Sequence, residues 1–258
     1  MKYDAIILAG GQSASELKKI APYDNEALII IGNSPMICYV YRALRASQNV
    51  GRIIISGPVK DLRVILGKEP GLLFVEGGDS AVDSFANAVA ALKEQEMSAS
   101  LLVMPTDIPF ITTSAIDDFI IQSERYNADF FYPLTSREVN ESKFPGVSRT
   151  YVKLREGTFT GGNLFIIRSR VIDKVMNMAA ELVKRRKSPL AMARLFGLGL
   201  VIQYFFKRLS IPAVEKRFAE VMGITGKAVI SGYAEVGVDV DKPSDLQLAQ
   251  TYLSGSSL

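Results

Sequence analysis

The opening strand of the chain constrains its fold more than any other feature. An apolar run, Ala5–Ala9, contains β-branched residues and ends in a pair of glycines, Gly10 and Gly11. Such a run predicts a buried strand, and the glycine pair predicts a tight turn that a ligand can approach closely. Backbone N–H groups exposed in a turn can bind phosphate oxygens without help from a side chain. The opening therefore predicts a sheet with a nucleotide site at the end of its first strand.

The first half of the chain alternates between strand-like and helix-like segments. Further apolar runs predict strands at Arg52–Ser56, Leu72–Val75 and Leu101–Met104. The segments between them predict helices that are capped by Ser34 ahead of Pro35, by Asp79 or Ser80, and by Thr112 or Thr113. This alternation is typical of an α/β fold with a Rossmann-like, mostly parallel sheet and helices on both faces. Ligands of such sheets bind at the carboxyl ends of the strands.

The second half of the chain departs from this alternation. Strands are predicted at Phe130–Pro133, Tyr151–Leu154, Asn163–Ile167, Ala228–Ile230 and Glu235–Val240, and a last helix begins at Pro243. Residues 172–223 have a mostly helical, apolar pattern that is rich in lysine and arginine. We therefore expect a single domain over residues 1–258 with a helical insertion at about residues 172–223. The polar end, Ser254–Ser257, is expected to be disordered.

Composition narrows the chemistry that the chain can carry out. It has no histidine and one cysteine, Cys38, so a histidine base and a zinc site rich in Cys or His are excluded. Any metal must bind mainly oxygen ligands, which favours Mg²⁺. The net charge of +3 gives no indication of nucleic-acid binding. Because no signal-peptide pattern or membrane-length apolar stretch is visible, we expect a cytoplasmic protein. Because free cysteines are usually buried, we expect Cys38 to be a buried thiol.

Three aspartates lie where the sequence predicts a metal site. Asp107 follows the strand that ends at Met104, which places it at the same sheet edge as the glycine pair. Asp239 and Asp241 are two apart in a predicted strand, so they share one face. Carboxylates from distant segments suit a Mg²⁺ ion that also binds substrate phosphates. Alternatively, Asp107 is a turn residue bonded to the backbone, and Asp241 caps the helix that begins at Pro243.

Several segments, taken in order, resemble one enzyme family. They are Leu8–Gly11, Ala27–Met36, Thr106–Phe110, Thr160–Phe165 and Asp239–Leu246. Together they are similar to the GT-A-fold nucleotidyltransferases, in particular the molybdenum-cofactor guanylyltransferases and the methylerythritol-phosphate cytidylyltransferases. That family joins a nucleoside triphosphate to a phosphorylated small-molecule acceptor and releases pyrophosphate. The resemblance therefore implies these two substrates, with Mg²⁺ as the cofactor.

The resemblance also implies roles for individual residues. The nucleotide would contact Leu8, Ala9, Gly10, Gly11, Gln12, Gly77, Gly78, Ser84 and Thr106. The metal would bind Asp107, which is also catalytic, together with Asp239 and Asp241. The acceptor would contact Lys153, Gly161, Gly162 and Asn163. Ser84 matches a serine near the base in the cytidylyltransferases, which favours CTP.

The loop after the glycine pair departs from the family pattern. Family members have an arginine in this loop and a lysine just before Ala27, whereas here the lysine position is Glu26. A carboxylate at that place would repel a triphosphate by about 1 kcal/mol or more. Lys18 or Lys19 could supply the missing catalytic charge, or both could lie on the solvated face of a short helix. We predict a working enzyme. The alternative is a non-catalytic nucleotide sensor.

The predicted insertion combines basic and apolar sequence. It carries a basic cluster, Lys184–Lys187, and an apolar run, Leu195–Phe206. Such a segment could lie on an anionic membrane surface. We expect instead that its apolar face packs on the domain or forms a homodimer contact, with the basic side chains in solvent.

Overall fold

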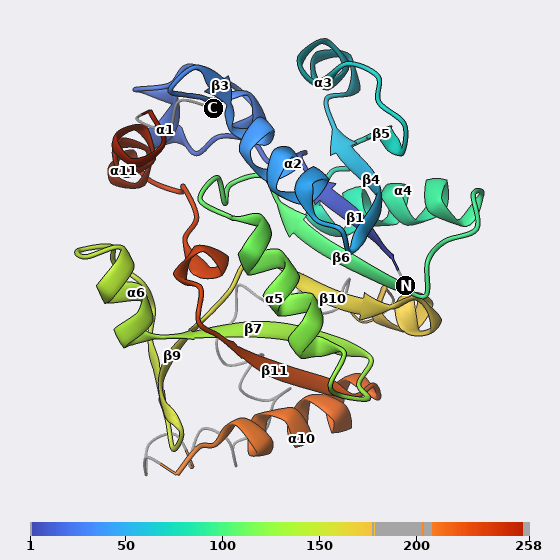
Figure 1. Ribbon diagram of the computed structural model, residues 1–258, viewed down its shortest axis with the longest axis vertical. Coiled ribbons are helices and arrows are strands. Elements are labelled where there is room, and N and C mark those ends of the chain that lie inside the picture. Colours follow the sequence, from blue (N-terminus) through green and yellow to red (C-terminus); the bar gives the residue numbers. More distant parts are fainter. Residues whose placement is uncertain (1, 177, 179–202, 204–207, 255–258) are drawn as a thin grey trace.

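The computed structural model describes residues 2–176, 178, 203 and 208–254 (Figure 1). The basic cluster Lys184–Lys187, most of the apolar run Leu195–Phe206 and the tail after Ser254 lie outside these described residues. Within the predicted insertion, residues 172–176 are helical and α10 (Ile211–Met222) follows later. Among the helices that are described, none combines the length and the apolar character needed to cross a membrane.

Within the described residues, the core element is a nine-stranded sheet with strand order β5-β4-β1-β6-β10-β7-β9-β8, in which β11 also pairs with β7. The strands are β1 (Tyr3–Leu8), β4 (Val50–Gly57), β5 (Leu72–Glu76), β6 (Ser100–Pro105), β7 (Phe130–Ser136), β8 (Val152–Leu154), β9 (Gly157–Gly161), β10 (Phe165–Arg168) and β11 (Gly226–Ser231). The pairs among β5, β4, β1 and β6 are parallel, and β10 is antiparallel to both β6 and β7. The predicted Rossmann-like, mostly parallel α/β sheet is confirmed.

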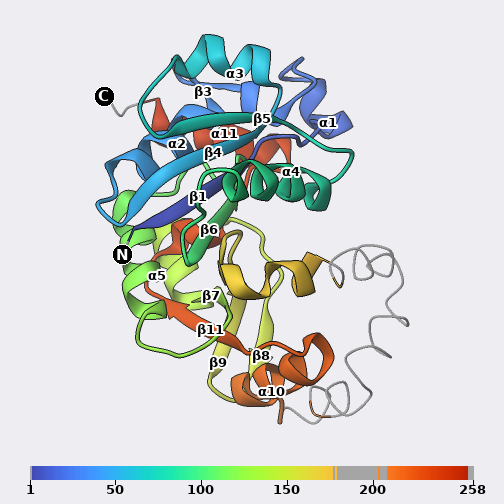
Figure 2. The same cartoon turned by 90° about the vertical axis from the view of Figure 1, so that its right-hand side faces the viewer.

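Helices cover both faces of the sheet (Figure 2). Alternate side chains of β1 point to opposite faces, so both faces present apolar residues that a helix can bury. Ala5 and Ile7 pack in one buried cluster with α2 and α5, whereas Ile6 packs in another with α4. Besides α10 and the helical residues 172–176, the described α-helices are α1 (Ser15–Lys18), α2 (Met36–Ala46), α3 (Val59–Leu66), α4 (Ala81–Lys93), α5 (Thr113–Ser123), α6 (Arg137–Lys143) and α11 (Pro243–Leu253). The expected burial of Cys38, on α2, is confirmed.

The helix starts follow the sequence in two of three cases. Ser80 caps α4 and Thr112 caps α5, each through a side-chain oxygen that accepts a backbone N–H three residues later. The predicted cap at Ser34 is wrong, because Ser34 and Pro35 form β3, which pairs with β2 (Ile30–Ile31). Between them Gly32 has a positive φ of 58°, a conformation that suits glycine and lets the chain turn back.

The segment after β11 is not the strand that the sequence predicts. It begins with the 3₁₀ helix η3 (Ala234–Gly237) and continues without regular structure, so the predicted strand Glu235–Val240 is wrong. Its valines alternate in sequence and are buried, but Glu235 and Gly237 between and beside them are buried too, unlike the solvent-facing residues of a half-buried strand. The N–H of Val240 donates to the carbonyl of Asp107 at 2.8 Å. This hydrogen bond ties the segment to the end of β6.

Candidate functional site

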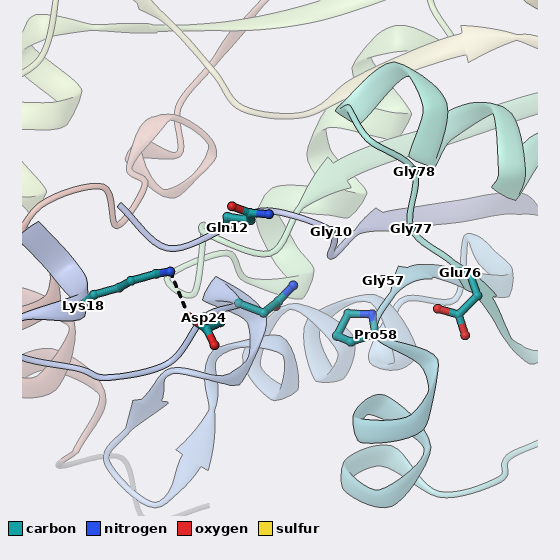
Figure 3. Close-up of a pocket in the computed structure, with 10 residues that line it drawn as sticks. Gly10, Gln12, Lys18, Asp24, Gly57, Pro58, Glu76, Gly77 and Gly78 are labelled. Carbon is teal, nitrogen blue, oxygen red and sulfur yellow. Dashed lines mark hydrogen bonds and ion pairs between the residues drawn. The ribbon is translucent and has the colours of Figure 1, made fainter. Parts of the chain in front are cut away.

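The two glycine loops meet at the carboxyl ends of β1, β4 and β5. A Cβ atom added to Gly77 would lie 3.5 Å from the Cα of Gly10 and 3.5 Å from the Cα of Gly57, so the three backbones are in close contact. A pocket of about 390 Å³ opens beside them (Figure 3). Its lining comes from the loop after β1, from α1 and the stretch that follows it, and from the ends of β4 and β5. The lining residues are Gly10, Gln12, Lys18, Asp24, Asn25, Gly57, Pro58, Glu76, Gly77 and Gly78.

The stretch before β2 holds the first glycine loop in place. The side-chain Nδ2 of Asn25 donates to the carbonyl of Ala9 at 2.8 Å, and its Oδ1 accepts the N–H of Ala27 at 2.9 Å. The N–H of Ser13 donates to the carbonyl of Asp24 at 2.9 Å. Asn25 thereby caps the short 3₁₀ helix η1 (Glu26–Leu28) and fixes the loop at the same time.

Ser84 lies at the contact between the two glycine loops. Its Oγ accepts the N–H of Gly78 at 3.0 Å and would lie 3.1 Å from a Cβ atom on Gly10. Of the other predicted nucleotide-binding residues, Ala9 and Thr106 are buried, Leu8 is half-buried, and Gly11 and Gln12 are exposed. The structure therefore brings the predicted nucleotide-binding residues to one edge of the sheet.

Replacing Gly57 with alanine is expected to destabilise the protein, because the new Cβ would lie 2.7 Å from the carbonyl oxygen of Ala9. Neither backbone can move without shifting β1 or β4, so we expect a loss of about 1–3 kcal/mol in the free energy of unfolding. Thermal unfolding followed by circular dichroism measures this change. Gly232→Ala is the matched control, since nothing lies within 4 Å of a Cβ there. Equal midpoints for the two variants would contradict the close approach.

A group of carboxylates lies beside the glycine loops. Burial and the negative charges of Asp239, Glu26 and Asp241 raise the pKa of Asp107 to about 8. Burial, Asp241 and Asp239 likewise raise the pKa of Glu26 to about 7. The N–H of Glu26 donates to the carbonyl of Gly11 at 3.2 Å, and a carboxylate oxygen of Glu26 would lie 2.9 Å from a Cβ atom on Gly11, so this carboxylate is next to the first glycine loop. We call Glu26, Asp107, Asp239 and Asp241 the carboxylate group.

The members of the carboxylate group have different partners. Within the described part of the chain, Oδ1 of Asp107 is buried and has no hydrogen-bond partner. Asp239 forms a part-buried ion pair with Arg149. Asp241 is exposed and does not cap α11, whose N-cap is Lys242. The N–H groups of Asp241 and Lys242 both donate to the carboxylate of Asp245.

These donors fit a hard cation in kind, because they are oxygens and one of them is buried without a partner. Among the residues that the structure describes, however, no group of three or more Asp, Glu, Cys or His side chains is arranged to hold a metal ion. The predicted set Asp107, Asp239 and Asp241 is therefore not assembled as a three-ligand site. Asp239 is instead ion-paired with Arg149, and Asp241 is exposed.

The two lysines predicted as catalytic cations lie on and after the short helix α1. Lys18 lines the pocket, and its Nζ is ion-paired with Asp24 at 2.9 Å (Figure 3). Lys19 is the C-cap of α1 and is exposed. This placement agrees with the alternative that both lysines lie on a short helix, and it leaves Lys18 at the pocket.

The residues predicted to bind the acceptor separate into two places. Gly161, Gly162 and Asn163 lie where β9 ends, and the N–H groups of the last two donate to carbonyls of β7 and η3. The Nδ2 of Asn163 is buried without a partner in the described residues. Lys153 lies on β8, opposite Thr158, at the sheet edge farthest in strand order from β5. The structure does not bring Lys153 together with the other predicted site residues.

Sequence reasoning missed Arg149 and Asn25. Arg149 contacts Asp239 across 90 residues, and no local pattern marks an ion pair between such distant segments. The role of Asn25 leaves a signal, because asparagine ahead of a short helical turn is a preferred cap. The sequence shows that Glu26 is a carboxylate where the family has a lysine, but its proximity to Asp107, Asp239 and Asp241 follows only from the fold.

The fold and the site define an α/β protein of the nucleotidyltransferase class, with glycine loops and carboxylates at one edge of the sheet. Residues 5–193 match the family described as the MobA-like NTP transferase domain, and the chain belongs to this family. The predicted family and fold are thus confirmed. No curated protein sequence matches this chain.

Solved structures agree with this assignment. A hypothetical transferase from Thermus thermophilus is 33% identical, with a TM-score of 0.80 over 95% of this chain and 100% of that chain. The 4-diphosphocytidyl-2C-methyl-D-erythritol synthase of Anaerococcus prevotii is 17% identical, with a TM-score of 0.62 over 98% and 96% of the two chains. A CMP:2-keto-3-deoxy-manno-octonic acid synthetase, solved with CTP, is 13% identical, with a TM-score of 0.61 over 98% and 99%. The last two similarities concern the fold alone.

Proposed function

We propose that this protein transfers a nucleoside monophosphate from a nucleoside triphosphate to a phosphorylated small-molecule acceptor and releases pyrophosphate. The observation that carries the proposal is the meeting of two glycine loops and the carboxylate group at one sheet edge, in a chain of the MobA-like NTP transferase family. We propose that the reaction takes place in the cytoplasm, a reducing compartment in which a free thiol such as that of Cys38 persists.

The proposed roles follow from the chemistry of phosphoryl transfer. The exposed backbone of Gly10–Gln12 and the turn at Gly77–Gly78 would bind the nucleotide. Asp107 and Asp239 would hold Mg²⁺, which binds readily to one or two carboxylates and completes its shell with phosphate oxygens and water. When bound, the metal would neutralise the charge of the phosphates. Since the acceptor phosphate is itself the nucleophile, positioning and charge neutralisation suffice, and no histidine is needed.

The acceptor and the base are finer parts of the proposal. The backbone and side chain of Asn163, with Gly161 and Gly162, would contact the acceptor. CTP is favoured by Ser84, which lies at the contact of the two glycine loops. Both assignments come from the family resemblance and are supported by the position of these residues at strand ends.

A pyrophosphate-release assay tests the proposal. The purified protein is incubated with each of the four ribonucleoside triphosphates, MgCl₂ and a panel of sugar, polyol and pterin phosphates. We expect pyrophosphate to form only when a triphosphate, an acceptor and the metal are all present, and to form fastest with CTP. A protein that binds no nucleoside triphosphate, with or without metal, would contradict the proposal.

The second candidate is a nucleotide-binding sensor without catalysis. Glu26 favours it, because this carboxylate adds negative charge next to the loop proposed to bind phosphates. Pyrophosphate release distinguishes the two candidates. The sensor is favoured if the protein binds a triphosphate saturably but releases no pyrophosphate with any acceptor of the panel.

A further inference from the structure

Arg149 brings a positive charge into a site whose other buried charges are acidic. It lies between α6 and β8, and its Nη1 donates to Oδ1 of Asp239. The side chains of Arg149 and Asp239 are 13% and 18% exposed, so the ion pair is largely removed from water. A guanidinium that is held this way has already lost most of its rotamer freedom, so binding a second partner costs it little further conformational entropy.

Two other cations near the site pair with carboxylates outside the carboxylate group. Lys18 pairs with Asp24, and Lys143 pairs with Glu235. Lys242 lies near Asp241 but forms no ion pair with it in the described part of the chain. Among the described residues, Arg149 is therefore the cation that makes direct contact with the carboxylate group.

The charge balance of the site indicates what Arg149 is for. A phosphate chain carries several negative charges, and the ionised members of the carboxylate group repel it. The planar guanidinium matches the geometry of phosphate oxygens and binds them through two parallel N–H donors. Its partner Asp239 is the same carboxylate that is proposed to hold the metal, so the pair must open for both groups to act.

We propose, on the basis of the proposed function, that Arg149 binds the phosphate chain of the nucleotide. Asp239 holds the guanidinium in place until the nucleotide arrives. Asp239 then has a positioning role in addition to its proposed metal contact. The family resemblance assigns no role to Arg149.

Isothermal titration calorimetry tests the inference with CTP, with inorganic tripolyphosphate and with cytidine, each in EDTA and in MgCl₂. Arg149→Gln is expected to weaken binding of CTP and tripolyphosphate about tenfold or more, because it removes a charge-assisted hydrogen bond to phosphate. Its affinity for cytidine should change by less than twofold. Arg149→Lys should lie between the two, because it keeps the charge but not the paired donors. Asp239→Asn should strengthen tripolyphosphate binding in EDTA, since it releases the guanidinium.

The control is Arg63→Gln on α3, whose exposed side chain forms no ion pair in the described residues and should leave all affinities within twofold. If Arg149→Gln does not fold, the double variant Arg149→Gln/Asp239→Asn removes both charges and must still bind more weakly than Asp239→Asn. Unchanged phosphate affinity in Arg149→Gln, with wild-type protein that binds CTP, would overturn the inference and leave the proposed function standing. Wild-type protein that binds no nucleotide would overturn the proposed function itself.

Discussion

Replacing Asp107 with asparagine is expected to reduce pyrophosphate release by about a hundredfold or more, because it removes a carboxylate that is proposed to hold Mg²⁺, the ion that neutralises charge developing on the phosphates. The carboxylate lies at the end of β6, and its buried Oδ1 has no hydrogen-bond partner in the described residues. Asp61→Asn on α3 is the control, because Asp61 is exposed and distant in sequence from every predicted site residue. Equal activity of the two variants would contradict a catalytic role for Asp107.

The same substitution is expected to stabilise the protein at high pH. The pKa of Asp107 is raised to about 8 in the folded state, whereas an unfolded chain has a value of about 3.9. Between these values the folded protein holds a proton that the unfolded chain has released, so stability falls as pH rises through this window. Above about pH 8 the folded state carries the full cost of the buried charge.

Asp107→Asn removes this cost. At pH 9 we expect its free energy of unfolding to exceed that of wild-type protein by about 2 kcal/mol or more, with little difference at pH 4. Urea unfolding at both pH values measures the difference. A variant that loses both activity and stability at pH 9 would indicate a damaged fold rather than a missing catalytic carboxylate.

Glu26→Lys is expected to raise the affinity for a nucleoside triphosphate about tenfold or more. The carboxylate of Glu26 would lie 2.9 Å from a Cβ atom on Gly11, which places it beside the loop proposed to bind phosphates. The substitution replaces repulsion with attraction, and each of these terms is worth about 1 kcal/mol even in high dielectric. It also relieves the crowding of negative charge with Asp239 and Asp241.

Calorimetry with each triphosphate measures this gain, and salt should reduce it. Glu94→Lys at the end of α4 makes the same change in net charge far from the glycine loops in sequence, and it should leave affinity nearly unchanged. An affinity that falls in Glu26→Lys would mean that Glu26 contributes to binding. If pyrophosphate release rises together with affinity, the native Glu26 limits an existing activity, which favours the enzyme over the sensor.

Local sequence patterns predict most of the first half of the fold. The apolar strands, the glycine turns and the caps Ser80 and Thr112 each depend on neighbours within a few residues, so their signals are visible in the sequence. The cap predicted at Ser34 failed because a residue that suits a cap also suits the short hairpin of β2 and β3.

The site was predictable only in part, because its assembly depends on long-range contacts. Alternating valines around Asp239 indicated a strand, but Glu235 and Gly237 beside Val236 are buried as well. The segment is fixed instead by the hydrogen bond from the N–H of Val240 to the carbonyl of Asp107. The proximity of Asp107 and Asp239 therefore follows from a tertiary hydrogen bond and not from a strand face. The ion pair of Arg149 has no sequence signal for the same reason.

A crystal structure with CTP and Mn²⁺, read by the anomalous signal of the metal, tests the central claim most directly. We predict phosphate density against the backbone of Gly10–Gln12 and an anomalous peak within bonding distance of Asp107 and Asp239. We also predict that the guanidinium of Arg149 has turned from Asp239 to the phosphates. Nucleotide bound elsewhere on the molecule, or a metal peak away from both aspartates, would contradict the account.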